Sequence, residues 1–78
     1  MSHLAIVSMI LQERLRQDEK FGEQNIGPAP WLVILGEEFG ECCRAVCDGD
    51  IKNLRKELIQ VAAVAVAMLQ CAERNDWK

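Results

Sequence analysis

Residues 36–60 read GEEFGECCRAVCDGDIKNLRKELIQ, and this stretch decides how the chain folds. Apolar residues recur through both halves of the stretch at steps of three and four, which is the period of an amphipathic helix. Gly49 lies between the halves, where glycine accepts the left-handed conformation that ends a helix. Asp50 follows it and can cap the N-terminus of a second helix. The stretch therefore predicts an antiparallel helical hairpin with its turn at Gly49.

Three helices are predicted over the whole chain. The first runs from His3 to about Lys20 with Ser2 as its N-cap, the second from about Trp31 to Cys47, and the third from Ile51 to about Arg74. Residues 21–30, which contain two glycines and two prolines, form the loop between the first two helices. No segment alternates apolar and polar residues as a strand does. The sequence thus predicts a single all-α domain over all 78 residues, a three-helix subunit containing the hairpin.

The composition is that of a small folded protein that buries part of its surface against other copies of itself. Half of the 78 residues are apolar, whereas a core this small leaves a lone monomer marginally stable. We therefore expect the subunits to assemble into an oligomeric helical bundle. The net charge is −3 and no basic stripe is present, so the sequence argues against binding of a nucleic acid polymer.

Hydropathy and cysteine usage indicate where the protein works. The longest apolar run, residues 58–72, is shorter than the roughly 20 residues needed to cross a bilayer, so no membrane partner is expected. The four cysteines follow helical spacing, and the first residues lack the positively charged start of a secretory signal. We therefore expect reduced cysteines, packed as small apolar groups, in a cytoplasmic protein.

Glutamates interrupt an otherwise apolar face of the second predicted helix. At about 100° per residue, Glu38 and Glu41 share a line that is apolar at both ends, and Glu37 flanks that line. On the third helix, Glu57 and Gln60 interrupt a second apolar line in the same way. The alternative interpretation is a set of solvated surface charges paired with basic neighbours, which is the usual place for a helical glutamate.

Counting outward from Gly49 brings these residues together. Glu41 and Glu57 each lie eight residues from it. Glu38 and Gln60 each lie eleven residues from it. Residues equidistant from the turn of an antiparallel pair lie at the same level, so the spacing predicts one cluster of three carboxylates and an amide. Crowded carboxylates in a partly buried site need a cation between them. Oxygen ligands without His or Cys favour Mg²⁺, or Mn²⁺, over Zn²⁺.

The same residues resemble the signature of the MazG-type all-α nucleoside triphosphate pyrophosphohydrolases. That family carries E-E-x-x-E on one helix and, a dozen or more residues later, E-x-x-D on the next. Here residues 37–41 read EEFGE, and residues 57–60 read ELIQ after a gap of fifteen residues. Residues 16–24 are also similar to the lead-in of small members associated with phages and mobile elements. The resemblance covers about residues 12–72.

The resemblance implies Mg²⁺-dependent hydrolysis of (deoxy)nucleoside triphosphates to monophosphate and pyrophosphate, of the housecleaning type. Glu38, Glu41 and Glu57 would be metal ligands, joined by Gln60. Glu37 and Glu38 would be the catalytic residues that position and activate the attacking water. Small members of the family form dimers or tetramers of helical bundles, so the resemblance implies a homodimer or homotetramer.

One residue departs from the family's motif, because Gln60 stands where the family has Asp. An amide oxygen can bind Mg²⁺ but carries no charge and cannot act as a base. Two other functions stay open. One is a phosphoribosyl-ATP type pyrophosphohydrolase. The other is a non-catalytic helical oligomer that binds nucleotide or a protein partner, with its active site weakened by Gln60.

Four residues are candidates for contacts with the nucleotide. Trp31 would stack on the base while Gln24 and Asn25 read its edge, and Lys56 would meet a phosphate. The alternative for Trp31 is a packing role at the start of its helix. The alternative for the loop residues is a solvated connector, and for Lys56 it is an ordinary surface lysine.

Overall fold

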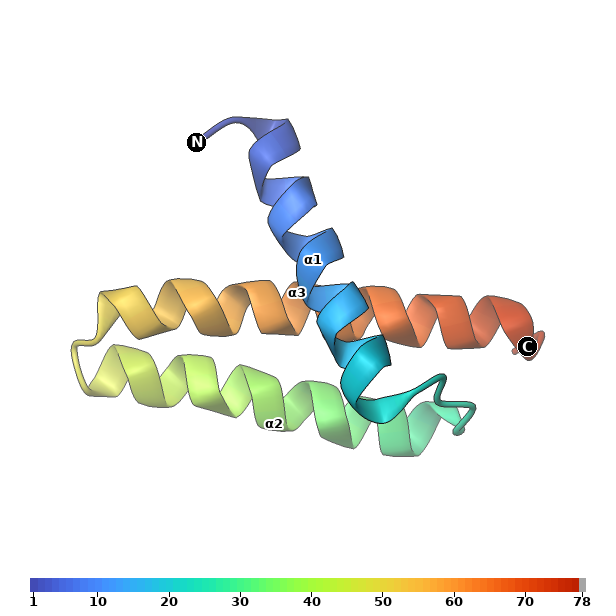
Figure 1. Ribbon diagram of the computed structural model, residues 1–78. Helices are drawn as coiled ribbons and strands as arrows, with labels where there is room; N and C mark the ends of the chain where they lie inside the picture. Colours follow the sequence, from blue (N-terminus) through green and yellow to red (C-terminus); the bar gives the residue numbers. More distant parts are fainter. Residues whose placement is uncertain (78) are drawn as a thin grey trace.

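Three helices make up the structure, a computed structural model that describes residues 1–77; the last residue of the predicted domain lies outside this range (Figure 1). They are α1 (His3–Phe21), α2 (Pro28–Cys47) and α3 (Ile51–Arg74). The predicted all-α class is confirmed, and so are the predicted bounds of α1 and α3 to within one residue. α2 begins at Pro28, before the predicted start at Trp31, because proline suits the first turn of a helix, where no N–H is needed.

Local side-chain chemistry explains where the helices begin and end. The Ser2 hydroxyl accepts a hydrogen bond of 3.1 Å from the N–H of Ala5. Asp50 Oδ1 accepts one of 3.0 Å from the N–H of Asn53. Gly49 follows α2 in the left-handed region at φ +69°, where a residue with a Cβ is strained. These contacts confirm the two predicted N-caps and the predicted turn.

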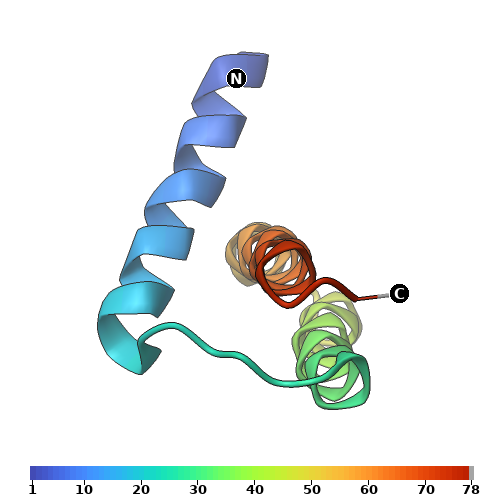
Figure 2. The ribbon, with the colours of Figure 1, turned by 90° about the vertical axis from the view of Figure 1, so that its right-hand side faces the viewer.

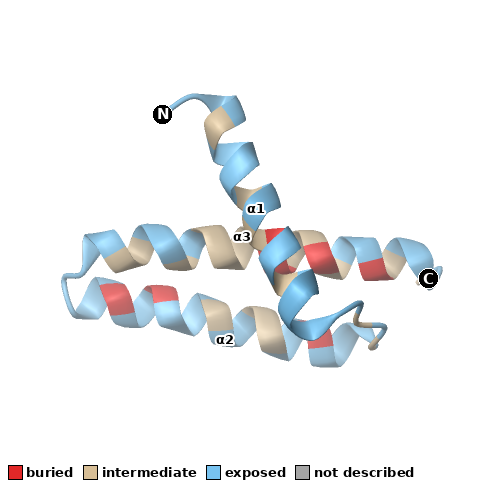
Figure 3. Cartoon of the chain, viewed as in Figure 1, coloured by how far each residue is buried: buried red, intermediate tan, exposed pale blue. Residues whose placement is uncertain are grey.

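α2 and α3 run antiparallel and side by side, as the sequence around the turn predicted (Figures 1 and 2). At the end away from the turn, Trp31 of α2 packs against Val64, Ala67 and Cys71 of α3. Buried positions lie on both arms of the hairpin, and small residues such as Cys42 are buried nearer the turn (Figure 3). The hairpin is therefore held by the buried ring of Trp31, by small side chains that allow close approach, and by larger, partly buried side chains such as Leu35 and Met68 that pack around them.

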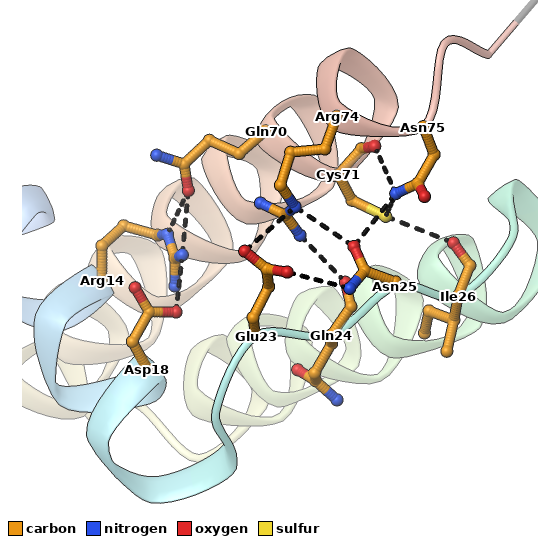
Figure 4. A network of polar contacts seen from close by, with 10 residues as sticks. All are labelled: Arg14, Asp18, Glu23, Gln24, Asn25, Ile26, Gln70, Cys71, Arg74 and Asn75. Atoms are coloured by element: carbon orange, nitrogen blue, oxygen red, sulfur yellow. Dashed lines mark hydrogen bonds and ion pairs between the residues drawn. The ribbon is translucent and has the colours of Figure 1, made fainter.

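α1 lies across α3 and packs on it, but not on α2 (Figure 2). Arg14 anchors this crossing, although it is charged and only 8% exposed. Its Nε and Nη2 donate to Gln70 Oε1 at 3.1 and 2.9 Å (Figure 4). Nη2 also donates to Asp18 Oδ1 at 2.8 Å. A buried guanidinium is tolerated only when its N–H groups are paired, so this network fixes where α1 lies on α3.

The loop between α1 and α2 is tied to the end of α3. Arg74 Nε donates to Asn25 Oδ1 at 3.1 Å, and Arg74 Nη2 donates to the carbonyl oxygen of Gln24 at 3.1 Å (Figure 4). Cys71 Sγ donates to the carbonyl oxygen of Ile26 at 3.3 Å. These contacts join residues that are far apart in sequence, so they hold the loop against the hairpin.

The single chain leaves a large surface exposed. Its accessible surface is 5758 Å², against about 4800 Å² expected for a compact monomer of 8.8 kDa. Large apolar side chains are more than half exposed on all three helices: Leu4, Leu11, Leu15 and Phe21 on α1, Leu32, Val33, Phe39 and Val46 on α2, and Ile51, Leu58 and Leu69 on α3. None of the described helices is long and apolar enough to cross a membrane.

Replacing Gly49 by alanine tests the conformation of the turn. We expect Gly49→Ala to lower the free energy of unfolding by about 1 kcal/mol, because a Cβ is disfavoured at positive φ even where space is open. Gly36→Ala is the matched control. It lies inside α2, where alanine favours the helix by about 0.5–1 kcal/mol. Chemical denaturation measures both changes, and a neutral or stabilising Gly49→Ala would contradict the strained turn.

Candidate metal centre

The side chain of Gln60 joins the two arms of the hairpin. With the amide oriented so that its nitrogen faces these neighbours, Gln60 donates to Glu38 Oε2 at 2.9 Å and to Glu57 Oε2 at 3.3 Å. The orientation of the amide is assigned from these neighbours, because the opposite one would point its carbonyl oxygen at two carboxylate oxygens. Glu38 of α2 therefore meets Glu57 and Gln60 of α3, which confirms that the spacing from the turn brings these three residues together.

Negative charge accumulates around Glu38. Burial raises the pKa of the Glu38 carboxyl, and the charges of Glu57 and Glu41, followed by Glu13 and Glu37, raise it further. Both effects disfavour the ionised form, so the carboxylate is held where its charge is poorly compensated by the protein. The amide N–H of Gln60 supplies part of the missing compensation.

The donor set fits a hard cation. Carboxylate and amide oxygens are the ligands of Mg²⁺ and Mn²⁺, and Gln60 can present its nitrogen to bare carboxylates or its oxygen to a cation. Within residues 1–77, however, no group of three or more His, Cys, Asp or Glu side chains is arranged to hold a metal ion. The centre of the candidate site is therefore Glu38, Glu57 and Gln60.

Glu41 and Glu37 lie at the rim of this centre. Both are exposed, and both contribute to the raised pKa of Glu38 through their charge. Cys42, the residue after Glu41, is buried. Burial raises the pKa of its thiol, and the charge of Glu57 raises it further. The rotation of α2 thus turns Cys42 toward the hairpin and Glu41 outward, which the level count from the turn did not resolve.

α1 brings two further charged residues to the site, Glu13 and Arg16, and neither was predicted from the sequence as a site residue. The Glu13 side chain is only 14% exposed, and its charge contributes to the raised pKa of Glu38. Glu13 Oε1 and Oε2 accept hydrogen bonds from Arg16 Nε and Nη2 at 2.9 and 2.6 Å. In the sequence, Glu13 and Arg16 lie among other polar residues of α1, and nothing distinguishes them from surface residues. Their place at the site follows from the position of α1 on α3, which depends on the Arg14 network.

The predicted nucleotide contacts divide between two grooves. Lys56 and Gln60 line a groove of about 320 Å³ between α1 and α3, beside the carboxylates. Gln24 and Trp31 line a second groove of about 670 Å³ between the end of α1, the following loop and α3. Asn25 takes part in the network that holds the loop on α3. Only Lys56 is thus placed next to the candidate metal centre.

Trp31 is placed as a packing residue in the single chain. Its side chain is 3% exposed and lies in the core of the hairpin. Its Nε1 is buried without a hydrogen-bond partner among the described residues. Base stacking needs an open ring face, so Trp31 can stack on a nucleotide only after the groove beside it opens.

Comparison with known proteins adds no further evidence about the site, since no family model, no curated protein and no solved structure matches the chain.

Replacing Glu38 by glutamine tests the charge at the centre. Because the folded protein raises the pKa of Glu38, this residue loses its contribution to stability as the pH rises through that pKa. We therefore expect Glu38→Gln, in EDTA, to be more stable than the wild type at neutral pH. The difference should shrink as the pH falls toward about 4. Mg²⁺ should stabilise the wild type and leave the variant unchanged.

Chemical denaturation between neutral and acidic pH measures these differences. Glu19→Gln makes the same change in net charge at an exposed position on α1 and reports the effect of net charge alone. Equal stability of Glu38→Gln and the wild type at neutral pH would contradict a desolvated Glu38.

Proposed function

We propose that the chain is a Mg²⁺-dependent, MazG-type pyrophosphohydrolase that cleaves (deoxy)nucleoside triphosphates to monophosphate and pyrophosphate in the cytoplasm, in a housecleaning role. The observation that carries the proposal is the contact of Gln60 with Glu38 and Glu57 across the hairpin. It brings the two predicted motifs to one point, in a half-buried place where the protein itself leaves negative charge poorly compensated.

Glu38, Glu57 and Gln60 would hold the cation, with Glu41 at the rim. When bound, Mg²⁺ or Mn²⁺ polarises the phosphates and neutralises the charge that develops on them. Glu37 is exposed on α2 next to Glu38, so it would accept a hydrogen bond from the attacking water and orient it. Glu38, the second predicted catalytic residue, would act as a ligand of the cation and so help to fix where the attacking water lies relative to Glu37.

A homodimer or homotetramer is part of this proposal. The single chain exposes more surface than a compact monomer of its mass, and large apolar side chains are exposed on every helix. Exposed apolar area of this extent is the usual sign of an interaction surface. Assembly would also cover the rim of the site if the exposed faces of α2 and α3 take part.

A non-catalytic helical oligomer that binds nucleotide or a protein partner is the second candidate. The observation that favours it is the small number of carboxylates at the centre: two carboxylates meet an amide there, and no larger group forms within residues 1–77. A site with less negative charge binds Mg²⁺ less tightly.

A product assay separates these functions. The purified chain, incubated with Mg²⁺ and each (deoxy)nucleoside triphosphate or phosphoribosyl-ATP, should release pyrophosphate and monophosphate but no orthophosphate. EDTA should abolish the reaction. Glu57→Gln should lower kcat by about 100-fold or more, because a metal ligand supports several kcal/mol of transition-state stabilisation. Glu19→Gln, exposed on α1, is the control with the same change in charge.

Three outcomes would count against the proposed reaction. Absence of product from every nucleotide, together with absence of Mg²⁺ binding, would refute the proposed function. Nucleotide binding without turnover would favour the non-catalytic oligomer. Release of orthophosphate would leave the metal site in place but refute cleavage between the α- and β-phosphates.

A further inference from the structure

We propose, on the basis of the function proposed above, that Arg16 of α1 and Lys56 of α3 form a polyphosphate-binding wall and hold the β- and γ-phosphates of the substrate. Both residues line the groove of about 320 Å³ between α1 and α3. Gln60 lines the same groove and donates hydrogen bonds to Glu38 and Glu57. One end of the groove therefore adjoins the candidate metal centre, and two cationic side chains stand along its walls.

Glu13 holds the Arg16 guanidinium in a defined orientation. Arg16 Nε and Nη2 donate to the two oxygens of Glu13 at 2.9 and 2.6 Å, and Gln17 Nε2 donates to Glu13 Oε2 at 3.4 Å. A guanidinium has five N–H donors in a rigid planar fork, so three of them stay free beside the pair with Glu13. The Arg16 side chain is 53% exposed, so these donors are accessible to a ligand.

The charge around the centre explains why such a wall is needed. Glu13, Glu37, Glu41 and Glu57 all act on Glu38 through their negative charge, and a triphosphate approaching them would be repelled unless cations compensate. The hydrogen bond to Glu13 is the main cause that raises the pKa of Arg16, and the charge of Glu38 adds to it. The guanidinium is thus both fully charged and close enough to the centre to sense its carboxylates.

The lining of the groove fits phosphate better than a nucleobase. In the described part of the chain, its polar residues are Gln12, Glu13, Arg16, Lys56 and Gln60, and none of its lining residues is aromatic. A base would find no ring to stack on, whereas a guanidinium fork and an ammonium group are the usual ligands of phosphate oxygens. The phosphates that leave as pyrophosphate would therefore lie toward α1.

Glu13 becomes a positioning residue in this arrangement. It touches neither the metal nor the phosphates, and it acts by fixing the plane of the Arg16 guanidinium. Its removal should weaken phosphate binding without removing a cation from the groove.

The test uses inorganic tripolyphosphate with Mg²⁺ as the probe and the full chain in every variant. Calorimetry should show that Arg16→Gln and Lys56→Gln each weaken binding of the probe about tenfold or more, the usual loss of a charge-assisted hydrogen bond. Arg16→Lys should recover only part of the loss, because an ammonium cannot form the fork. Glu13→Gln should weaken binding severalfold. Binding of Mg²⁺ alone should not weaken in the Arg16 and Lys56 variants, because neither residue is a metal ligand.

Arg55→Gln is the matched control, because it removes one positive charge from α3 next to Lys56 and Arg55 lines neither groove. Its affinity for the probe should stay within about twofold of the wild type. Circular dichroism checks that each variant is folded. The proposal is overturned if the wild type does not bind tripolyphosphate, or if folded Arg16→Gln and Lys56→Gln bind it as tightly as Arg55→Gln does.

Nucleotide kinetics test the polyphosphate-binding wall independently of the proposed function. In the active enzyme, Arg16→Gln should raise KM for the triphosphate about tenfold and leave the pyrophosphate product unchanged. Normal KM in Arg16→Gln, with pyrophosphate still released, would refute the wall and leave the function standing. Loss of tripolyphosphate binding in Arg16→Gln, in a protein that hydrolyses no nucleotide, would refute the function and leave the wall standing.

Discussion

The amide of Gln60 lies between two carboxylates from different helices, and the candidate site depends on this contact. Glu38 and Glu57 would repel each other across the hairpin if nothing stood between them. A neutral N–H donor compensates them in part, at 2.9 and 3.3 Å. The same side chain can offer its oxygen to a cation. Gln60 would thus suit both the empty site and a site that holds the proposed cation.

Arg14 and Arg16, both on α1, differ in burial and therefore in role. Arg14 is buried, and its N–H groups are used on Gln70 and Asp18, where they fix α1 against α3. Arg16, two residues later, is exposed and paired only at one edge with Glu13. The first arginine therefore stabilises the fold, and it places the second beside the carboxylates. The position of the helix and the electrostatics of the site are linked through this short segment.

The ends of the helices and the contact between Glu38 and Gln60 could be predicted from the sequence, whereas the packing of α1 on α3 could not. Ser2, Asp50 and Gly49 fix the ends of the helices through contacts within a few residues, and the meeting of Glu38 with Gln60 follows from counting along two rigid helices. Counting residues from the turn gives the level of a residue along the helix axis but not the rotation of α2 about that axis. The outward position of Glu41 was therefore not predicted. The place of Glu13 and Arg16 depends on long-range contacts of Arg14, and no spacing rule connects α1 with α3 across the first loop and α2.

Crystals grown with Mn²⁺ would show whether a cation binds between Glu38, Glu57 and Gln60, because the anomalous signal of the ion locates it independently of activity. We expect an anomalous peak about 2 Å from carboxylate oxygens of Glu38 and Glu57 and from the amide oxygen of Gln60. Gln60 would then have turned its oxygen toward the ion. A structure at saturating Mn²⁺ that shows no ion there, with the Gln60 nitrogen still on both carboxylates, would contradict it.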